Sequence, residues 1–170
     1  MSGDLEARAA SGDIGAFGSY IRACDARLRG VAWAVVRDAH ATDDVMQSAY
    51  EKAFRSLADF DARSSLSTWL YSIVYRTALD HQNYERRRRH DDIDTVELAG
   101  VADPAVAVVS ILELASVLDE LAPRDRAALM LTIGLGFSYA EVAEIVGEPQ
   151  GTIASRVSRT RRRLERWEQR

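Results

Sequence analysis

Apolar residues recur every three or four positions along most of this chain, and that periodicity excludes most fold classes at once. One such stripe consists of Val45, Ala49, Ala53 and Leu57. This spacing places side chains on one face of an α-helix, whereas a half-buried strand alternates apolar and polar residues. With 47% hydrophobic and 28% charged residues, the composition is that of a globular protein. The sequence therefore predicts an all-α fold.

The stripes and their interruptions predict the order of helices in the first half of the chain. Residues 14–36 form one long bent helix or two shorter ones. The next helix begins at Thr42 as its N-cap, because a threonine oxygen can accept from a free amide and the acidic residues that follow suit the helix dipole. A short polar loop at 60–66 ends this pattern. A further helix runs from about Ser67 toward the arginine run at 86–89.

Near the C-terminus, two short helices are joined by a tight turn. Ser138 and Glu141 fit a capping box, in which the serine oxygen accepts from a backbone amide and the glutamate reaches back to the serine. Gly147 suits the left-handed conformation that ends a helix, and Pro149 and Gly151 continue the turn. Two helices in this arrangement, the second with a polar outer face, are typical of a helix-turn-helix, whose second helix enters the major groove of DNA.

The second of these helices has one apolar face and one face rich in basic and hydroxyl groups. The apolar face consists of Ile153, Val157, Thr160 and Leu164. At about 100° per residue, the opposite face consists of Ser155, Ser158, Arg159, Arg162 and Arg166. Arginine bonds phosphates or the edge of guanine, and serine suits either. We predict that this face binds DNA; the alternative is a solvated basic helix that packs on its neighbours.

Between the two helical regions the periodicity weakens, acidic residues accumulate, and Gly100 and Pro104 appear. Residues 91–120 contain no lysine or arginine. We therefore predict two small helical domains joined by an acidic linker. Residues 1–90 form an N-terminal helical bundle, residues 91–110 form the linker, and residues 111–170 form a C-terminal helix-turn-helix domain.

Charge and composition limit the class of function. The net charge of −4 argues against a protein that coats DNA unselectively, yet seven arginines in the last fifteen residues allow a local basic surface. The single cysteine, Cys24, excludes an intrachain disulfide, and no signal peptide or membrane-spanning run is present, so we expect a cytoplasmic protein. Adjacent Asp43 and Asp44 diverge on a helix and the histidines are scattered, so we predict no metal, no cofactor and no catalytic residue.

In the order of its motifs, the chain resembles the bacterial extracytoplasmic-function (ECF) sigma factors, the small promoter-recognition subunits of RNA polymerase. AASGDIGAFGSYIR resembles the opening helix of that family, and DDVMQSAYEKAFRSLADFD resembles its polymerase-binding segment. STWLYSIVYRTALDHQNYERRRR resembles its promoter-melting and minus-10 segment. The family's minus-35-binding domain is the part similar to the last long segment, LDELAPRDRAALMLTIGLGFSYAEVAEIVGEPQGTIASRVSRTRRRLER. Together these motifs cover nearly the whole chain except the linker.

The resemblance implies contacts with polymerase and with two promoter elements. Asp44, Gln47 and Ser48 match positions that face the coiled-coil clamp of the largest core subunit. The loop at 60–67 matches one that captures a base flipped out of the non-template strand. The implied minus-10 contacts are Phe60, Asp61, Arg63, Ser64, Ser65, Tyr75, Arg76, Arg86 and Arg87. The implied minus-35 contacts are Thr152, Ser155, Arg156, Ser158, Arg159 and Arg162.

Helical phase distinguishes the aromatic residues of the minus-10 segment. Trp69 and Leu70 lie on the apolar stripe, so we expect them in the core. Tyr71 and Tyr75 lie off that stripe, so we expect them to be less buried and able to stack on bases.

As a sigma factor, the protein would act with core RNA polymerase, promoter DNA and an anti-sigma factor, and bond formation would belong to the core enzyme. Two alternatives remain. One is a helix-turn-helix regulator that binds operator DNA alone, and the other is an interaction protein that sequesters polymerase without reading DNA. The segment from Asp43 to Arg89 argues against the first, because an operator-binding regulator has no use for a polymerase-binding helix and a melting segment.

Overall fold

The computed structural model of the protein describes residues 2–91, 118 and 120–168, and the regular elements within these residues are all helical, as predicted. The N-terminal half, residues 2–91, contains α1 (Ser2–Ala10), α2 (Ile14–Val36), α3 (Ala39–Ser56), the short 3-10 helix η1 (Leu57–Asp59) and α4 (Leu66–Asp91). The C-terminal half, residues 118 and 120–168, contains α6 (Pro123–Leu129), the π-helical turn η2 (Met130–Gly134), α7 (Tyr139–Val146) and α8 (Gln150–Glu168). The predicted linker lies almost entirely outside the described residues.

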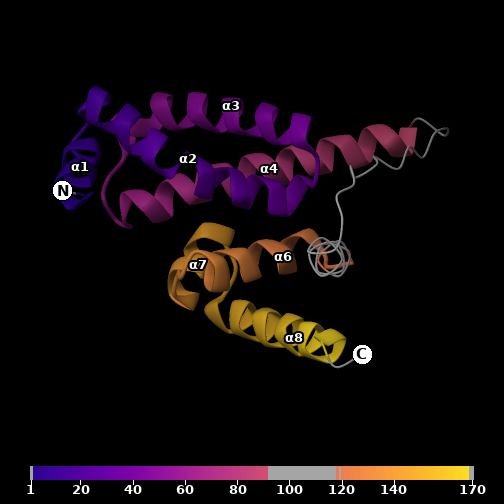
Figure 1. The fold of residues 1–170 in the computed structure, drawn as a ribbon. Coiled ribbons are helices and arrows are strands. Elements are labelled where there is room, and N and C mark those ends of the chain that lie inside the picture. The colour runs from indigo at the N-terminus through magenta and orange to yellow at the C-terminus, as the bar shows by residue number, and fades with distance from the viewer. Residues whose placement is uncertain (1, 92–117, 119, 169–170) are drawn as a thin grey trace, which may run out of the picture.

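In the N-terminal half, α2, α3 and α4 run alongside one another and α1 lies at one end of the bundle (Figure 1). The stripes predicted from the sequence face the interior, where Phe17, Leu28, Val45, Leu70 and Val74 are almost completely buried. Because three amphipathic helices each bury one face against the other two, the bundle encloses a continuous apolar core.

The ends of these helices differ in detail from the prediction. Residues 14–36 form one helix, which begins where the Asp13 carboxylate accepts from the amide of Ala16. The prediction of Thr42 as an N-cap is wrong, because Asp38 caps α3 by accepting from the amide of Ala41 at 2.7 Å. Thr42 lies inside the first turn, is buried, and donates its hydroxyl to the Asp38 carbonyl.

The helix-turn-helix of the C-terminal half is present as predicted. The Ser138 hydroxyl accepts from the amide of Glu141, and the Glu141 carboxylate accepts from the Ser138 amide at 2.8 Å. Hydrogen bonds from the Ser138 side chain and backbone hold the pKa of Glu141 below its ordinary value. Gly147 ends α7 with φ of 75°, a left-handed conformation that glycine adopts without strain.

Removal of this cap has a predictable effect on stability. We expect Ser138→Ala to lower the free energy of unfolding by about 1 kcal/mol, because the amide of Glu141 loses its acceptor. Urea denaturation followed by circular dichroism measures this change. Ser158→Ala, on the exposed face of α8, is the control and should change stability by less than about 0.5 kcal/mol. An equal loss in both variants would contradict a capping role for Ser138.

The two halves share one hydrophobic core. α7 packs on α4 and α6 packs on α2, so that α6 and α7 stand between the N-terminal bundle and α8 (Figure 1). The ring of Phe137, just before α7, meets the ring of Tyr71 on α4 edge to face, with 4.9 Å between ring centroids. Leu131 and Ile145 of the C-terminal half are fully buried in the same cluster as Val74 of α4.

Candidate nucleic-acid interface

The outer face of α8 is the surface that the sequence predicts to bind DNA through basic and hydroxyl side chains. The helix buries Ile153, Val157 and Thr160 against its neighbours. The residues exposed on its other side are Thr152, Ser155, Ser158, Arg159, Arg162 and Arg166. α8 lies on the side of α6 and α7 away from the N-terminal bundle, so neighbouring helices leave this face open (Figure 1).

Arg156, by contrast, is directed into the C-terminal half. Its guanidinium donates to Asp125 at 2.8 Å and to Glu148 at 2.7 Å, and its side chain is only 15% exposed. Burial alone would lower the pKa of Arg156, but its hydrogen bond to Asp125 and the charge of Glu148 outweigh burial and raise this pKa. The guanidinium therefore connects α6, the α7–α8 turn and α8. Its two terminal nitrogens both donate to carboxylates, and its Nε is buried.

Arg124 extends this ion-pair network. It donates to Glu148 at 2.8 Å, so Glu148 joins Arg124 and Arg156. The sequence reasoning missed the network because Asp125 and Arg156 are 31 residues apart. The network fixes the turn of the helix-turn-helix against α6 and thereby sets the direction in which α8 presents its exposed face.

The loop between η1 and α4 has a defined conformation. Ala62 has a φ of 57°, and the neighbouring Arg63 guanidinium forms an ion pair with Asp61 at 2.7 Å. The Ser65 hydroxyl accepts from the amide of Thr68, so Ser65 caps α4. Asp61, Arg63 and Ser65 are exposed and Ser64 is partly exposed, as a surface that binds extruded bases requires.

Aromatic side chains anchor this loop on the bundle. The partly buried ring of Phe60 lies 5.2 Å from that of Trp69, and Trp69 in turn lies 6.2 Å from Phe17. Leu70 is fully buried, as predicted, whereas Trp69 is only partly buried. One edge of the loop is therefore fixed to the core while its polar residues face outward.

Helix α4, which follows the loop, exposes Arg76, Arg86 and Arg87 to solvent. The prediction that Tyr71 and Tyr75 of this helix are less buried is wrong. Tyr75 is completely buried and Tyr71 is 3% exposed. Helical phase placed them off the stripe that faces α2 and α3, but α4 has a second apolar face, which α7 and Phe137 cover. Burial raises the pKa of both hydroxyls to about 12.

Asp44, Gln47 and Ser48 are all exposed on the outer face of α3, whereas Val45 and Ala49 point into the core. Figure 1 places α3 on the side of the bundle opposite the C-terminal half. Glu51 lies one turn beyond Gln47 on the same face, is also exposed, and forms an ion pair with Arg55 at 3.1 Å.

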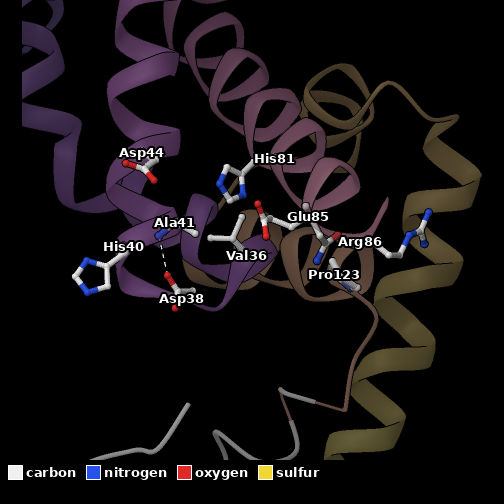
Figure 2. A pocket seen from close by; sticks show the side chains of 10 residues that line it. Val36, Asp38, His40, Ala41, Asp44, His81, Glu85, Arg86 and Pro123 are labelled. Carbon is white, nitrogen blue, oxygen red and sulfur yellow. Dashed lines mark hydrogen bonds between the residues drawn. The ribbon is translucent and has the colours of Figure 1, made fainter. Parts of the chain in front are cut away.

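A groove of about 730 Å³ opens beside Asp44, where the N-terminal bundle meets the start of α6. Figure 2 shows His81, Glu85 and Arg86 of α4 along one side and Pro123 of α6 nearby. The groove is lined by charges of both signs, and no group of three histidine, cysteine or acidic side chains among the described residues is placed to hold a metal ion. None of the helices in the described ranges has both the length and the apolar character that a membrane crossing requires.

Comparisons with known proteins find family matches in both halves of the chain. Residues 20–89 match the family described as Sigma-70 region 2, and residues 111–164 match that described as Sigma-70, region 4. The chain is 33% identical to the RNA polymerase sigma-H factor of Pseudomonas aeruginosa over 95% of this chain and 91% of that protein. It is also 33% identical to the ECF RNA polymerase sigma factor SigC of Mycobacterium tuberculosis, over 92% of this chain and 85% of SigC.

Two solved structures resemble the whole arrangement. One is the sigma factor RpoE in complex with the anti-sigma factor NepR from Bartonella quintana, with a TM-score of 0.75, 30% identity, and coverage of 90% of this chain and 96% of that one. The other is CnrH in complex with the cytosolic domain of CnrY, with a TM-score of 0.69, 26% identity, and coverage of 95% and 92%. With matches of this extent in both halves, the chain belongs to the family of ECF RNA polymerase sigma factors.

Proposed function

We propose that the protein is a dissociable subunit of RNA polymerase that directs the enzyme to promoters through two DNA-binding surfaces. The observation that carries this proposal is their presence on one chain: the exposed basic face of α8, and the polar loop with the exposed arginines of α4. We assign the minus-10 and core-binding functions to residues 1–90, the linker to 91–110 and the minus-35 function to 111–170.

In the C-terminal half, α8 enters the major groove of the minus-35 element. Arg159 and Arg162 supply charge-assisted hydrogen bonds to guanine edges or phosphates, and Ser155, Ser158 and Thr152 bond bases or the backbone nearby. Arg156 is a positioning residue in this account, because its ion pairs hold α8 against α6 and the turn.

In the N-terminal half, the loop at 60–67 receives a base that has left the stack of the minus-10 element. Unstacking a base costs a few kcal/mol, which a shaped polar pocket must offset. Asp61, Arg63 and Ser64 supply donors and acceptors for its edge. Arg76, Arg86 and Arg87 on α4 neutralise phosphates alongside. The core enzyme polymerises RNA, whereas this subunit positions the enzyme on the promoter and assists separation of the DNA strands.

Docking on the core uses the outer face of α3. We expect Asp44→Arg to weaken binding to core RNA polymerase at least about tenfold, because a repulsive charge replaces an attractive one in the contact. Fluorescence anisotropy of the labelled protein titrated with core polymerase measures the dissociation constant. Asp4→Arg on α1 makes the same charge change at an exposed site away from α3 and is the control. Equal weakening by both substitutions would contradict a docking role for this face.

Regulation and location follow from the same assignment. The two solved relatives are in complexes with anti-sigma factors, and we propose that a protein of this kind also binds this chain. A polymerase subunit acts where the polymerase is, so we place the protein in the cytoplasm. An operator-binding regulator is not favoured, because region 2 of the sigma family spans residues 20–89 of this chain.

A further inference from the structure

The loop between η1 and α4 carries an exposed arginine that its neighbour holds at one end. Ala62 has a φ of 57°, and this left-handed turn brings the side chains of Asp61 and Arg63 together. One carboxylate oxygen of Asp61 accepts from the Arg63 amide at 3.2 Å, and the other lies 2.7 Å from the Arg63 Nε. Among the described residues, no acceptor bonds the two terminal nitrogens of this guanidinium.

The serines of the loop offer less selectivity than this arginine. The Ser65 hydroxyl accepts from the Thr68 amide at 3.0 Å and donates to the Thr68 hydroxyl at 2.9 Å, so the cap of α4 already uses it. The Ser64 hydroxyl can donate or accept and therefore suits any base. The Arg63 side chain is 89% exposed and donates only, so it is the group of the loop that distinguishes one base edge from another.

The four bases differ in how their acceptors are arranged. A guanidinium presents parallel N–H groups, which match two acceptors that lie side by side. Guanine has such a pair in O6 and N7, and an unpaired cytosine has one in O2 and N3. In both bases a donor follows the pair, and the remaining lone pairs of the Asp61 carboxylate suit that donor. Adenine and thymine alternate donors and acceptors along their edges, so neither offers the guanidinium two adjacent acceptors.

We propose that Asp61 positions Arg63 so that this loop selects cytosine or guanine, and rejects adenine and thymine, as the base extruded from the minus-10 element. The inference rests on the proposed function, because the loop meets an extruded base only if the protein binds promoters. Asp61 holds the guanidinium at Nε, and the terminal nitrogens of Arg63 supply the two donors. The aromatic contact of Phe60 with Trp69, 5.2 Å between ring centroids, holds the start of the loop against the bundle.

Transcription from a randomised promoter tests this selection. Holoenzyme reconstituted from core RNA polymerase and the full-length protein transcribes a library of a promoter that the protein activates, with the minus-10 element randomised and a transcribed barcode for each sequence. We expect one position at which cytosine or guanine exceeds adenine and thymine at least about tenfold, and the enriched base shows which of the two is bound. Arg63→Met should abolish the preference at that position and leave the others unchanged. Enrichment of adenine or thymine at the position that depends on Arg63 would overturn the proposal.

Two further variants separate base selection from charge and from loop structure. Asp61→Asn keeps an acceptor for the Arg63 amide but removes the negative charge beside Nε, so we expect it to reduce the preference at the same position. An undiminished preference would show that Asp61 supports only the backbone turn. Arg55→Met is the control, because Arg55 forms a similarly exposed ion pair with Glu51 outside the loop, and its base preferences should be unchanged. An equal loss of output for all four bases in Arg63→Met would indicate a phosphate contact and would overturn the proposal.

Base analogues test the acceptors themselves. The non-template strand of a synthetic promoter carries 7-deazaguanine, which lacks N7, or 3-deazacytosine, which lacks N3, in place of the selected base. We expect the analogue to lower output about tenfold with the unchanged protein and to have no further effect with Arg63→Met. Equal losses with both proteins would refute the bond from Arg63. Absence of any promoter-specific transcript would refute the proposed function, whereas promoter selection that Arg63→Met leaves unaltered would refute this inference alone.

Discussion

Replacing Arg159 and Arg162 together by alanine is expected to lower promoter-specific transcription by at least about 30-fold. Each bidentate contact to a base contributes about 1–3 kcal/mol of discrimination, so two lost contacts remove at least about 2 kcal/mol. Where an arginine bonds a phosphate instead, the slope of log affinity against log salt concentration falls by about 0.9 for each lost contact. Run-off transcription with reconstituted holoenzyme, and promoter binding by that holoenzyme over a range of salt, measure both effects.

The matched control removes the same charge from other sides of α8. Arg161 and Arg163 project about 80° to either side of the buried Ile153, so they flank the helix rather than lie opposite its core. Arg163 also pairs with Glu120 on the protein surface. Arg161→Ala with Arg163→Ala should therefore retain most of the promoter-specific output. Equal losses in the two double variants would mean that the total charge of α8, and not its outer face, determines promoter binding.

Replacing Arg156 by methionine is expected to destabilise the protein by about 3 kcal/mol, at the low end of the range for a broken buried pair because its partners stay partly exposed. Asp125 and Glu148 are 25% and 15% exposed, so each loses its hydrogen bonds to Arg156 in a poorly hydrated position. Denaturant unfolding of the full-length protein measures this loss. Promoter affinity should fall as well, with an unchanged salt slope, because no phosphate contact is removed.

Arg163→Met is the comparison for this prediction. Its ion pair with Glu120 joins side chains that are 45% and 66% exposed, and such surface pairs contribute about 0–1 kcal/mol. A loss of stability in Arg156→Met no larger than in Arg163→Met would show that the network does not hold α8. If Arg156→Met reduced the slope of log promoter affinity against log salt concentration by about one, Arg156 would instead contact a DNA phosphate.

Features that depend on neighbouring residues could be predicted from the sequence. The capping box of Ser138 and Glu141 and the helix end at Gly147 require only residues within one turn, and the structure contains them where predicted. The buried and exposed faces of α8 also follow from helical spacing alone, because this helix has a single buried face. The helical spacing of apolar residues was likewise sufficient to predict the all-α fold class.

Features that depend on distant partners could not be predicted in this way. Tyr75 is buried because the C-terminal half covers a second face of α4, and helical phase reveals only that a residue lies off the first stripe. Arg156 was assigned to the DNA-facing set, yet it meets carboxylates 31 and 8 residues away. The start of α3 was misplaced for a more local reason: both Asp38 and Thr42 are residue types that cap helices, and only the backbone conformation selects Asp38.

The most direct test of the sigma-factor assignment is reconstituted transcription from fragmented genomic DNA of the source bacterium, with core RNA polymerase in the presence and absence of this protein. Mapping the 5′ ends of the transcripts identifies each start site. We expect new start sites that share two spaced upstream elements, read by α8 and by the loop with α4. Unchanged start sites, in a reaction where the protein is bound to core polymerase, would contradict promoter selection by this chain.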